Sequence, residues 1–518
     1  MEKPRLLPMG IQSFEVLRND GFMYVDKTEM IYNLVTNPVP YFLSRPRRFG
    51  KSLLVTTMKA YFEGKKNLFE GLTIEKLETK WEKYPVFFID FNDEKFDSIE
   101  GLELIIKRHL VSWEEMYGKD TDQSLSGRFA GVIKRAYQQT GKRVVVLIDE
   151  YDKPLLQAIL DEKLSKKFRA LLKSFYGVLK SSGEYLRFIF LTGVTKFAQV
   201  SVFSDLNHLV DISLKHEYST ICGITKNELL QIFTPELKIT AQKQDLTFDE
   251  TVAEMTKQYD GYHFGYNTEG MFNPFSVLNA LRFSDFENYW FQTGTPTFLI
   301  DLLKKSDFDL RLLLDGVEMR SSDFAEYKAE INNPIPLIYQ SGYLTITGYN
   351  KKYKLYTLTF PNEEVRYGFI NFLLPFYTAV NDGKGGFHIA NFCEEVEAGK
   401  IEDFLERMKI FFAKIPYELN NENEKHYQAI FYIIFTLMGQ YIEAEVSSNT
   451  GRADAVVKTD DYIYLFEFKL NKTAEEAIKQ INTKEYLMPY KLDKRKLVKV
   501  GVEFCKEKRN IKRYIIEN

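Results

Sequence analysis

The sequence is poor in cysteine, and what it lacks limits what the protein can be. Its 518 residues include three cysteines, which lie far apart at Cys222, Cys393 and Cys505. This spacing offers neither a disulfide framework nor a cysteine-based metal site, and it fits a reducing compartment. No apolar run approaches the 18 residues of a membrane-spanning helix, and the N-terminal stretch has no apolar signal-peptide core. We therefore expect a cytoplasmic protein without a membrane partner.

Fixed-period repeats, low-complexity tracts and a strong charge of either sign are also absent. Apolar residues make up 45% of the chain and charged residues 27%, which is typical of a folded protein rather than a disordered one. The formal net charge of −3 does not by itself indicate a nucleic-acid partner. A chain of this length has room for several domains and a sizeable core.

A strand-to-helix turn near the N-terminus carries the clearest chemical signal. The stretch Tyr41–Ser52 reads YFLSRPRRFGKS and runs from a short apolar strand through Gly50 into an amphipathic helix. Gly50 allows the backbone to approach phosphate oxygens, and the N–H groups that follow point at them. Lys51 can reach the outer phosphates and Ser52 can ligate Mg²⁺. The segment therefore predicts a phosphate-binding loop for ATP with Mg²⁺.

One position of this loop departs from the common P-loop pattern. In G-x-x-x-x-G-K-[ST] the first glycine would stand at position 45, where this chain has Arg45. A lone GKS after a strand often arises by chance, so the assignment depends on a second motif downstream. With that motif present, we expect Arg45, Arg48 and Phe49 to contribute to the nucleotide site together with the GKS residues. No base-reading motif distinguishes ATP from GTP.

An acidic strand end supplies the second motif. Residues 143–150 read RVVVLIDE, and the five apolar residues suit a parallel strand that is buried on both faces. In P-loop NTPases an acidic residue such as Asp149 holds Mg²⁺, and a second acid such as Glu150 can activate the attacking water. A later strand ends at Thr192, and this side chain or Thr195 can sense the γ-phosphate. The alternatives are an ordinary solvated strand end and a plain turn.

Strands and helices alternate through residues 1–235. Near-continuous apolar strands separated by helical stretches predict a parallel sheet that is covered on both faces, as in a P-loop NTPase domain. Residues 236–330 are mostly helical and rich in aromatic residues. We interpret them as a helical lid with an aromatic core rather than as a base-stacking surface. His263 in this region has no Cys or acidic partner at metal-ligand spacing.

The middle of the chain predicts a small module and a linker. In residues 331–380 a helix-like PIPLIYQSG precedes two strand-like segments with a turn at 348–352, and a helical connector follows. Helix and hairpin resemble half of a winged-helix module; such modules can bind DNA, but many only fill the space between domains. The glycine-rich NDGKGG is the best linker candidate, which places a linker at residues 381–398.

The last region, residues 399–518, carries a second candidate site. Its central line, GRADAVVKTDDYIYLFEFKL, predicts a hairpin in which Glu467 and Lys469 share one face and Asp454 sits beside them on the paired strand. Two carboxylates and a lysine at one strand end suit phosphodiester hydrolysis, because the carboxylates can hold Mg²⁺ and the lysine can orient water. Gln480 on the following helix can point back at this site.

The alternative at this second site is a solvated strand face. Glu424 or Glu443 either adds a further ligand or is an ordinary surface acid. Charge supports a nucleic-acid partner, because 14 Lys and Arg residues stand against 7 Asp and Glu residues from Phe468 to Asn518, a local net of +7. Basic C-terminal segments are also common in proteins that do not bind nucleic acid. The local charge is therefore only supporting evidence for a nucleic-acid partner.

Together these segments resemble a known family. Nearly the whole chain is similar to the bacterial AAA-ATPase-like family whose members carry a C-terminal PD-(D/E)XK nuclease-like domain. In that family RPRRFGKS is the usual form of the loop, so the arginine at position 45 is not a local lesion. The segments that carry the resemblance are YVDKT, RPRRFGKS, LIDEYDKP, LTGVTKF, DGYHF, NPFS, GRAD and FEFKL.

The resemblance also implies roles for particular residues. The GKS residues, Gly50 to Ser52, bind nucleotide phosphate and Mg²⁺, and Asp149 with Glu150 forms the acidic strand end. In the PD-(D/E)XK pattern, Asp454, Glu467 and Lys469 match the three core positions. Gln480 matches the accessory position on the helix that follows.

These observations predict a multidomain α/β protein and favour an ATP-controlled, metal-dependent nuclease that acts on DNA or RNA. The alternative hypothesis is a nucleotide-dependent switch whose C-terminal fold binds nucleic acid or a protein without cutting it. Arg45 motivates this alternative, as does the absence of any arginine finger that the sequence would place. Without such a finger the sequence predicts no oligomeric state. A scaffold that senses a protein partner is a third reading.

Overall fold

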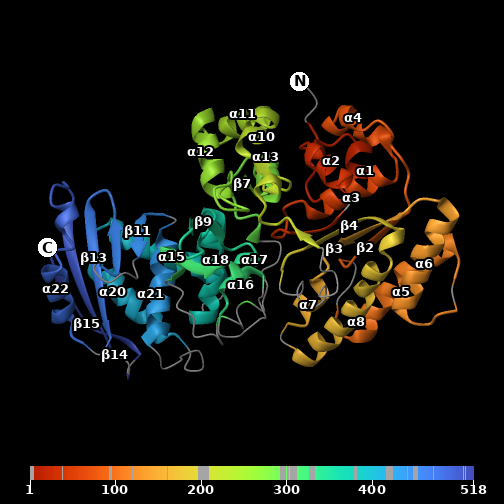
Figure 1. The fold of residues 1–518 in the computed structure, drawn as a ribbon. Coiled ribbons are helices and arrows are strands. Elements are labelled where there is room, and N and C mark those ends of the chain that lie inside the picture. The colour runs from red at the N-terminus through yellow and green to blue at the C-terminus, as the bar shows by residue number, and fades with distance from the viewer. Residues whose placement is uncertain are drawn as a thin grey trace. The chain divides into compact units, whose positions relative to one another are not determined.

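A computed structural model gives the fold of residues 5–518. Its description leaves out 38, 93–95, 120, 160, 197–208, 292–298, 300–302, 304–311, 326–332, 379–381, 416–423, 440, 447–452, 471, 506 and 508. The chain divides into two compact units (Figure 1). Unit 1 comprises Met1–Leu302 and Glu318–Asn362, and unit 2 comprises Leu303–Val317 and Glu363–Asn518.

A five-stranded parallel sheet is the centre of unit 1. Its strands are β1 (Pro40–Ser44), β2 (Val86–Asp90), β3 (Val144–Asp149), β4 (Leu186–Gly193) and β5 (Val210–Asp211). They lie in the order β2-β3-β4-β1-β5, and every neighbouring pair is parallel. β3 is buried along its whole length, because its apolar run packs on both faces. The predicted parallel sheet is therefore confirmed.

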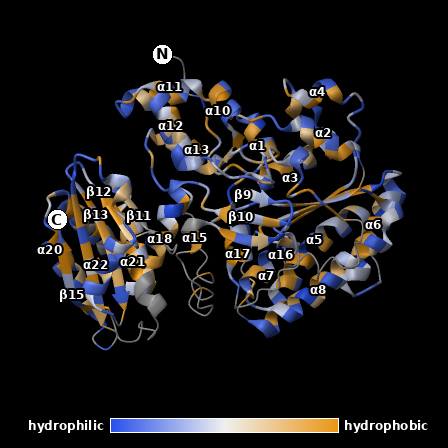
Figure 2. Cartoon of the chain, turned by 60° about the vertical axis from the view of Figure 1, so that its left-hand side comes forward, coloured by the Kyte–Doolittle hydropathy of each residue, from blue (hydrophilic) through white to orange (hydrophobic). Residues whose placement is uncertain are grey.

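Helices cover both faces of this sheet (Figure 1). On one face lie α1 (Phe14–Asn19) and α3 (Lys51–Phe62), and on the other lie α5 (Ile99–Tyr117), α6 (Leu125–Thr140) and α8 (Glu162–Ser181). The last three bury an apolar stripe and present polar residues outward, and Figure 2 shows both colours on them. The shorter helices of this part are α2 (Thr28–Thr36), α4 (Thr73–Leu77), α7 (Lys153–Gln157), η1 (Lys66–Phe69), η2 (Gly183–Tyr185) and η3 (His216–Tyr218).

A mostly helical region follows the sheet in unit 1; it begins at Ile224, before residue 236 where we expect a lid, and we use the name lid for it below. Its core contains Tyr259, Phe272 and Tyr289 together with aliphatic side chains, which agrees with the expected aromatic core. Within the described part of the chain, no helix here or elsewhere is long and apolar enough to cross a bilayer. The elements of the lid are β6 (Ile224–Thr225), α10 (Lys226–Ile232), α11 (Thr234–Lys243), α12 (Phe248–Tyr259), β7 (Met271–Phe272) and α13 (Pro274–Phe283).

A small three-stranded module completes unit 1. The helix and the hairpin expected here are present as α17 (Ile335–Gln340), β9 (Thr345–Asn350) and β10 (Leu355–Thr359). A strand that the sequence pattern did not reveal, β8 (Val317–Arg320), lies beside β10, and α16 (Ser321–Ala325) follows it. The strand order is β8-β10-β9.

A mixed five-stranded sheet organises unit 2. Its strands are β11 (Glu443–Val446), β12 (Ala455–Lys458), β13 (Tyr462–Leu470), β14 (Lys496–Cys505) and β15 (Asn510–Glu517), in chain order across the sheet. β13 and β14 are parallel, and the other pairs are antiparallel. Figure 2 shows hydrophobic residues along β12 and β13.

Helices also cover both faces of the unit 2 sheet. Phe466 of β13 contacts Phe404 and Phe435 on one face, whereas Ile463 and Leu465 pack with apolar residues of α22 on the other. The described helices of this unit are α15 (Leu312–Asp315), α18 (Glu363–Thr378), α19 (Asp382–Glu397), α20 (Ile401–Ala413), α21 (Glu424–Met438), α22 (Ala474–Thr483) and η6 (Met488–Tyr490).

The expected linker at residues 381–398 is wrong. Helix α19 occupies Asp382–Glu397, although the NDGKGG stretch supplies its first residues. Ile389, Phe392 and Val396 of α19 are buried at helical spacing. Burial of this stripe outweighs the low helix propensity of the glycines, so the segment is a helix of unit 2.

Gly261 in the lid gives a test of the fold. It has a φ of +93°, and a Cβ atom there would lie 2.1 Å from the carbonyl oxygen of Pro361. We expect Gly261→Ala to lower the melting temperature by about 5 °C or more, because backbone strain and overlap add. Gly177→Ala in α8 is the control: nothing lies within 4 Å of its Cβ, so the melting temperature should stay or rise. Equal melting temperatures for the two variants would contradict this account.

Candidate functional site

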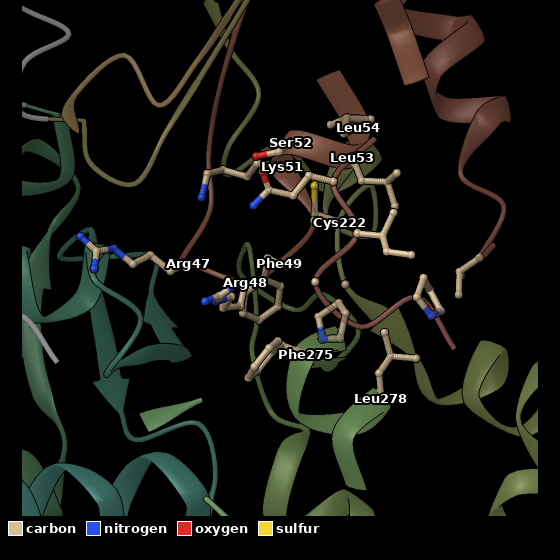
Figure 3. Close-up of a pocket in the computed structure, with 18 of the residues that line it drawn as sticks. Arg47, Arg48, Phe49, Lys51, Ser52, Leu53, Leu54, Cys222, Phe275 and Leu278 are labelled. Atoms are coloured by element: carbon tan, nitrogen blue, oxygen red, sulfur yellow. The ribbon is translucent and has the colours of Figure 1, made fainter. Parts of the chain in front are cut away.

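A cavity of about 530 Å³ opens at the start of α3 in unit 1, within the size range of small-molecule sites. Residues 47–54 line it from the phosphate loop and the start of α3, residues 10–12 and 23–25 with Lys27 from the N-terminal segment, and Phe275 and Leu278 from the lid. Figure 3 shows Lys51 and Ser52 on one side of this space and the two lid side chains on the other. The predicted phosphate loop therefore faces a cavity.

The loop turns into the helix at Gly50. Its φ of +89° is left-handed, a conformation that glycine adopts without steric cost, and α3 starts at the next residue. The unpaired N–H groups of the first helical turn favour an anion at this position. The Lys51 ammonium donates to two carbonyls of the loop at 3.1 and 3.3 Å and lies 3.2 Å from the Glu150 carboxylate. The loop lysine and the acid after β3 are thus brought together.

Asp149 ends β3 in the protein interior. Burial raises the pKa of Asp149 to about 6, and the neighbouring Glu150 adds to the rise, whereas the Ser52 and Thr192 hydroxyls and Lys51 oppose it. The Thr192 hydroxyl donates to Oδ1. Oδ2 is buried and has no hydrogen-bond partner among the described residues. A buried carboxylate oxygen near the Ser52 hydroxyl fits a divalent cation, because both are oxygen ligands of the type that Mg²⁺ prefers.

The two threonines expected as phosphate sensors lie behind the cavity rather than on its wall. Thr192 and Thr195 are fully buried and do not line the cavity. The Thr195 hydroxyl and N–H each donate to Asp152 at 2.6 Å, and burial raises the pKa of Asp152 to about 6. The sequence pattern missed Asp152, which lies in the LIDEYDKP segment. It holds the chain after β4 next to the chain after β3.

Arg45 is another expected nucleotide contact that does not line the cavity. It is 1% exposed, and burial lowers the pKa of Arg45 to about 10, which leaves it charged at pH 7. Its guanidinium donates to the carbonyls of Ser44, Ser213 and Tyr218 at 2.8 to 3.0 Å and lies 4.1 Å from the centre of the Phe264 ring. The side chain therefore fastens the loop to the interior.

The next loop residues contact the lid. The Arg48 guanidinium lies 4.8 Å from the Phe275 ring centre, and Arg48 lines the cavity as expected. Phe49 also lines it, but its ring is buried in edge-to-face contact with Tyr262 and Phe264 of the DGYHF segment, at 4.7 and 5.1 Å. The Trp290 indole donates to a loop carbonyl at 3.2 Å. The loop is thus held by side chains from three parts of the lid.

Several cavity residues were not identified from chemistry in the sequence. Lys27 forms an ion pair of 2.5 Å with Glu228 of α10, and Lys153 donates to the Asn92 carbonyl at 2.7 Å. Cys222 lies near Lys51 in Figure 3. The family resemblance could have pointed to Lys27 and Lys153, because they lie in its YVDKT and LIDEYDKP segments.

The second cluster lies where β13 ends in unit 2. Ala455 of β12 pairs with Phe466 of β13, so Asp454 comes next to Glu467. Asp454 accepts a hydrogen bond from the Phe468 N–H at 2.8 Å, and the Lys469 ammonium lies 2.6 Å from Glu467 Oε1. The two carboxylates and the lysine expected from strand alternation are therefore neighbours.

Glu467 is the buried member of this cluster. It is 1% exposed, and Oε2 has no hydrogen-bond partner among the described residues. Burial raises the pKa of Glu467 to about 7, the Asp454 charge adds to the rise, and the Lys469 ammonium opposes it. No three His, Cys, Asp or Glu side chains gather as a metal-holding group within the described ranges. Two carboxylates suit Mg²⁺, which keeps several waters when bound.

The accessory residues expected at this cluster have other partners. The Gln480 amide on α22 donates to the Tyr486 hydroxyl at 3.3 Å, and a capping box of Thr473 and Glu476 starts this helix. Glu443 is exposed and forms an ion pair with Lys458. Lys458 lies four residues, or about 13 Å along β12, from Asp454, so Glu443 is remote from this cluster. The side chain of Glu424 lies outside the described residues.

Known proteins were compared with the whole chain. A family model described as "Predicted AAA-ATPase" matches residues 8–203, and one described as "PD-(D/E)XK nuclease superfamily" matches residues 422–514. The "Uncharacterized protein in vnfD 5'region" of Azotobacter chroococcum mcd 1 is 33% identical over 527 residues, which cover 99% of each chain. The solved ORC2 protein of Aeropyrum pernix, in ADPNP and ADP complexes, is 10% identical with a TM-score of 0.27, over 70% of this chain and 92% of that one.

Arg45 gives a test of the loop. Arg45→Gly restores the common P-loop pattern but removes the donor for three carbonyls. We expect the free energy of unfolding to fall by about 3 kcal/mol or more, because each buried carbonyl left without a donor costs about 1 to 3 kcal/mol. Thermal unfolding and nucleotide titration should show lower stability and weaker binding. Arg45→Lys keeps the positive charge but lacks the planar guanidinium. Its stability and nucleotide affinity should lie between those of wild type and Arg45→Gly. A glycine variant with unchanged stability and tighter nucleotide binding would contradict the anchoring role.

Proposed function

Since the chain belongs to the AAA-ATPase-like family and carries a C-terminal domain of the PD-(D/E)XK nuclease superfamily, we propose that it is an ATP-controlled, Mg²⁺-dependent nuclease for DNA or RNA. One observation carries the proposal: the buried Glu467 carboxylate has Asp454 beside it and the Lys469 ammonium 2.6 Å away. A buried acid with a raised pKa next to a second acid and a lysine is typical of catalytic sites.

In this proposal the cavity of unit 1 holds the nucleotide. Lys51 leaves its carbonyl partners and neutralises the outer phosphates, and the N–H groups at the start of α3 bind phosphate oxygens. Ser52 and Asp149 would hold Mg²⁺, and the site fits because Asp149 Oδ2 is buried without a partner among the described residues. Glu150 orients the attacking water, and Thr192 acts through its hydrogen bond to Asp149.

The cluster of unit 2 hydrolyses the phosphodiester bond. Asp454 and Glu467 would hold Mg²⁺, which would neutralise charge at the scissile phosphate. Lys469 positions the attacking water and stabilises the charge that develops on phosphate oxygens. Gln480 orients the site from α22 once it exchanges its Tyr486 partner. The basic segment from Phe468 to Asn518 attracts the nucleic-acid backbone.

A second candidate function is a nucleotide-dependent switch whose C-terminal domain binds without cutting. The ion pair between Lys51 and Glu150 favours it. The two groups that ATP hydrolysis needs lie 3.2 Å apart and neutralise each other, instead of facing a phosphate and a water. Thr195, an expected phosphate sensor, also has another partner, because its hydroxyl donates to Asp152. Tight nucleotide binding with negligible turnover would distinguish this function from an active ATPase.

Matched variants test the proposal. Wild type, Lys51→Ala and Glu467→Ala receive plasmid, linear and single-stranded DNA and RNA with Mg²⁺ or Mn²⁺, with and without ATP. We expect Glu467→Ala to cut about 100-fold more slowly, the loss typical of removing a catalytic group. Lys51→Ala should bind ATP at least about 10-fold more weakly and lose the ATP effect on cutting.

Two charge-matched controls belong to this comparison. Lys59→Ala lies on the same helix as Lys51, and exposed Glu443→Ala lies in the same sheet as Glu467; both should behave as wild type. A wild-type protein that cuts no DNA or RNA under any of these conditions would overturn the nuclease.

The raised pKa of Glu467 predicts a pH profile. With a pKa of about 7, Glu467 is protonated below neutral pH and cannot then hold a cation. At limiting Mg²⁺ the cleavage rate should rise about tenfold per pH unit below 7 and level off above it. Raising Mg²⁺ should move the midpoint to lower pH, because the cation competes with the proton. Rates measured across pH at two Mg²⁺ concentrations check this, and a midpoint independent of Mg²⁺ would argue against Glu467 as a ligand.

A further inference from the structure

The hairpin of unit 1 ends in a basic turn that the functions above do not use. Residues 351–354, between β9 and β10, read KKYK, and all four are exposed. From Tyr343 to Thr359 the sequence contains three lysines and no acid. The turn is therefore a concentrated positive charge on a chain whose net charge is negative.

The turn has a defined shape. The Asn350 side chain accepts hydrogen bonds from the N–H groups of Lys352 and Tyr353 at 3.1 and 3.2 Å. Lys354 has a φ of +54°, and its carbonyl accepts from the Ser321 N–H at 3.4 Å. The lysine side chains thus start from fixed backbone positions at the end of a strand pair.

Aromatic rings accompany the lysines. Tyr353 is 61% exposed and Tyr266 is 43% exposed. Tyr266 contacts Tyr349 of β9 at 5.4 Å, and the Lys351 and Lys352 ammonium groups lie 5.9 and 5.1 Å from the ring centres of Tyr266 and Tyr353, respectively. Exposed rings beside cations provide stacking faces for bases and charge for phosphates.

We propose that this turn binds single-stranded nucleic acid. Lys351, Lys352 and Lys354 neutralise phosphates of the strand, and Tyr353 and Tyr266 stack on its unpaired bases. Stacking favours a single strand, because the bases of a duplex are already stacked on one another. The choice of nucleic acid as partner rests on the proposed function, but the contact lies in unit 1 with the nucleotide cavity rather than in the nuclease unit.

The opposite end of the hairpin adjoins the phosphate loop. Gly342, before β9, has no side chain, and a Cβ there would lie 2.6 Å from the side chain of Pro46. The Thr345 hydroxyl accepts from the His263 N–H at 2.7 Å, within the DGYHF segment that holds Phe49. The hairpin thus joins the proposed contact to the surroundings of the phosphate loop.

Fluorescence anisotropy of a labelled single-stranded oligonucleotide, DNA and RNA in separate arms, tests the proposal. The full-length protein is used with EDTA to prevent cutting. A Lys351→Ala, Lys352→Ala, Lys354→Ala variant should raise the dissociation constant at least about 10-fold and lower the log–log salt slope by about 2, since each single-strand phosphate contributes about 0.7. Tyr353→Ala should weaken binding, whereas Tyr353→Phe should retain it.

A charge-matched control separates a local contact from the general effect of charge. Lys163→Ala, Lys166→Ala, Lys167→Ala removes three exposed lysines from α8 and should leave affinity and slope unchanged. An equal loss in this control overturns the proposal, as does a hairpin variant that binds like wild type. If that variant also cuts like wild type, the nuclease proposal stands and the hairpin contact alone fails. A wild type that binds no oligonucleotide and cuts none overturns both.

Discussion

The nucleotide region of this protein depends on one buried guanidinium. Arg45 stands where a P-loop commonly has glycine, and its two terminal nitrogens donate to three backbone carbonyls beside an aromatic ring, whereas Nε has no partner among the described residues. A charge in the interior is costly unless it is hydrogen-bonded, so the segments that supply these carbonyls must stay close to Arg45. The loop, the strand before it and the lid are thereby fixed to one another. The shape of the cavity follows from that constraint.

Both candidate sites contain a buried carboxylate with a raised pKa. In each unit a central strand delivers a carboxylate to the interior, Asp149 from β3 and Glu467 from β13, and burial raises its pKa. Each has one oxygen without a partner among the described residues, and each has a lysine nearby. A carboxylate binds a cation only after it has lost its proton, so under the proposed function cation binding and protonation would oppose each other in both units.

Regular patterns made much of this predictable from the sequence. The apolar run before Asp149 specified a buried parallel strand, and alternation in β13 placed Glu467 and Lys469 on one face beside Asp454. The inward course of Arg45 was not predictable, because its partners come from segments far along the chain. The helix at 382–397 was missed because burial of its apolar stripe, not the propensity of its glycines, decides its conformation.

The anchoring of Arg45 also sets an order for folding. Its carbonyl partners at Ser213 and Tyr218 lie 168 and 173 residues downstream, and the ring of Phe264 comes later still. A nascent chain therefore exposes the GKS residues long before the groups that hold the loop have been synthesised. Domains generally fold as units during synthesis, and contacts across such separations form late. Competence to bind nucleotide then marks completion of the sheet and the lid, and a chain truncated before Phe264 would carry the motif without the site.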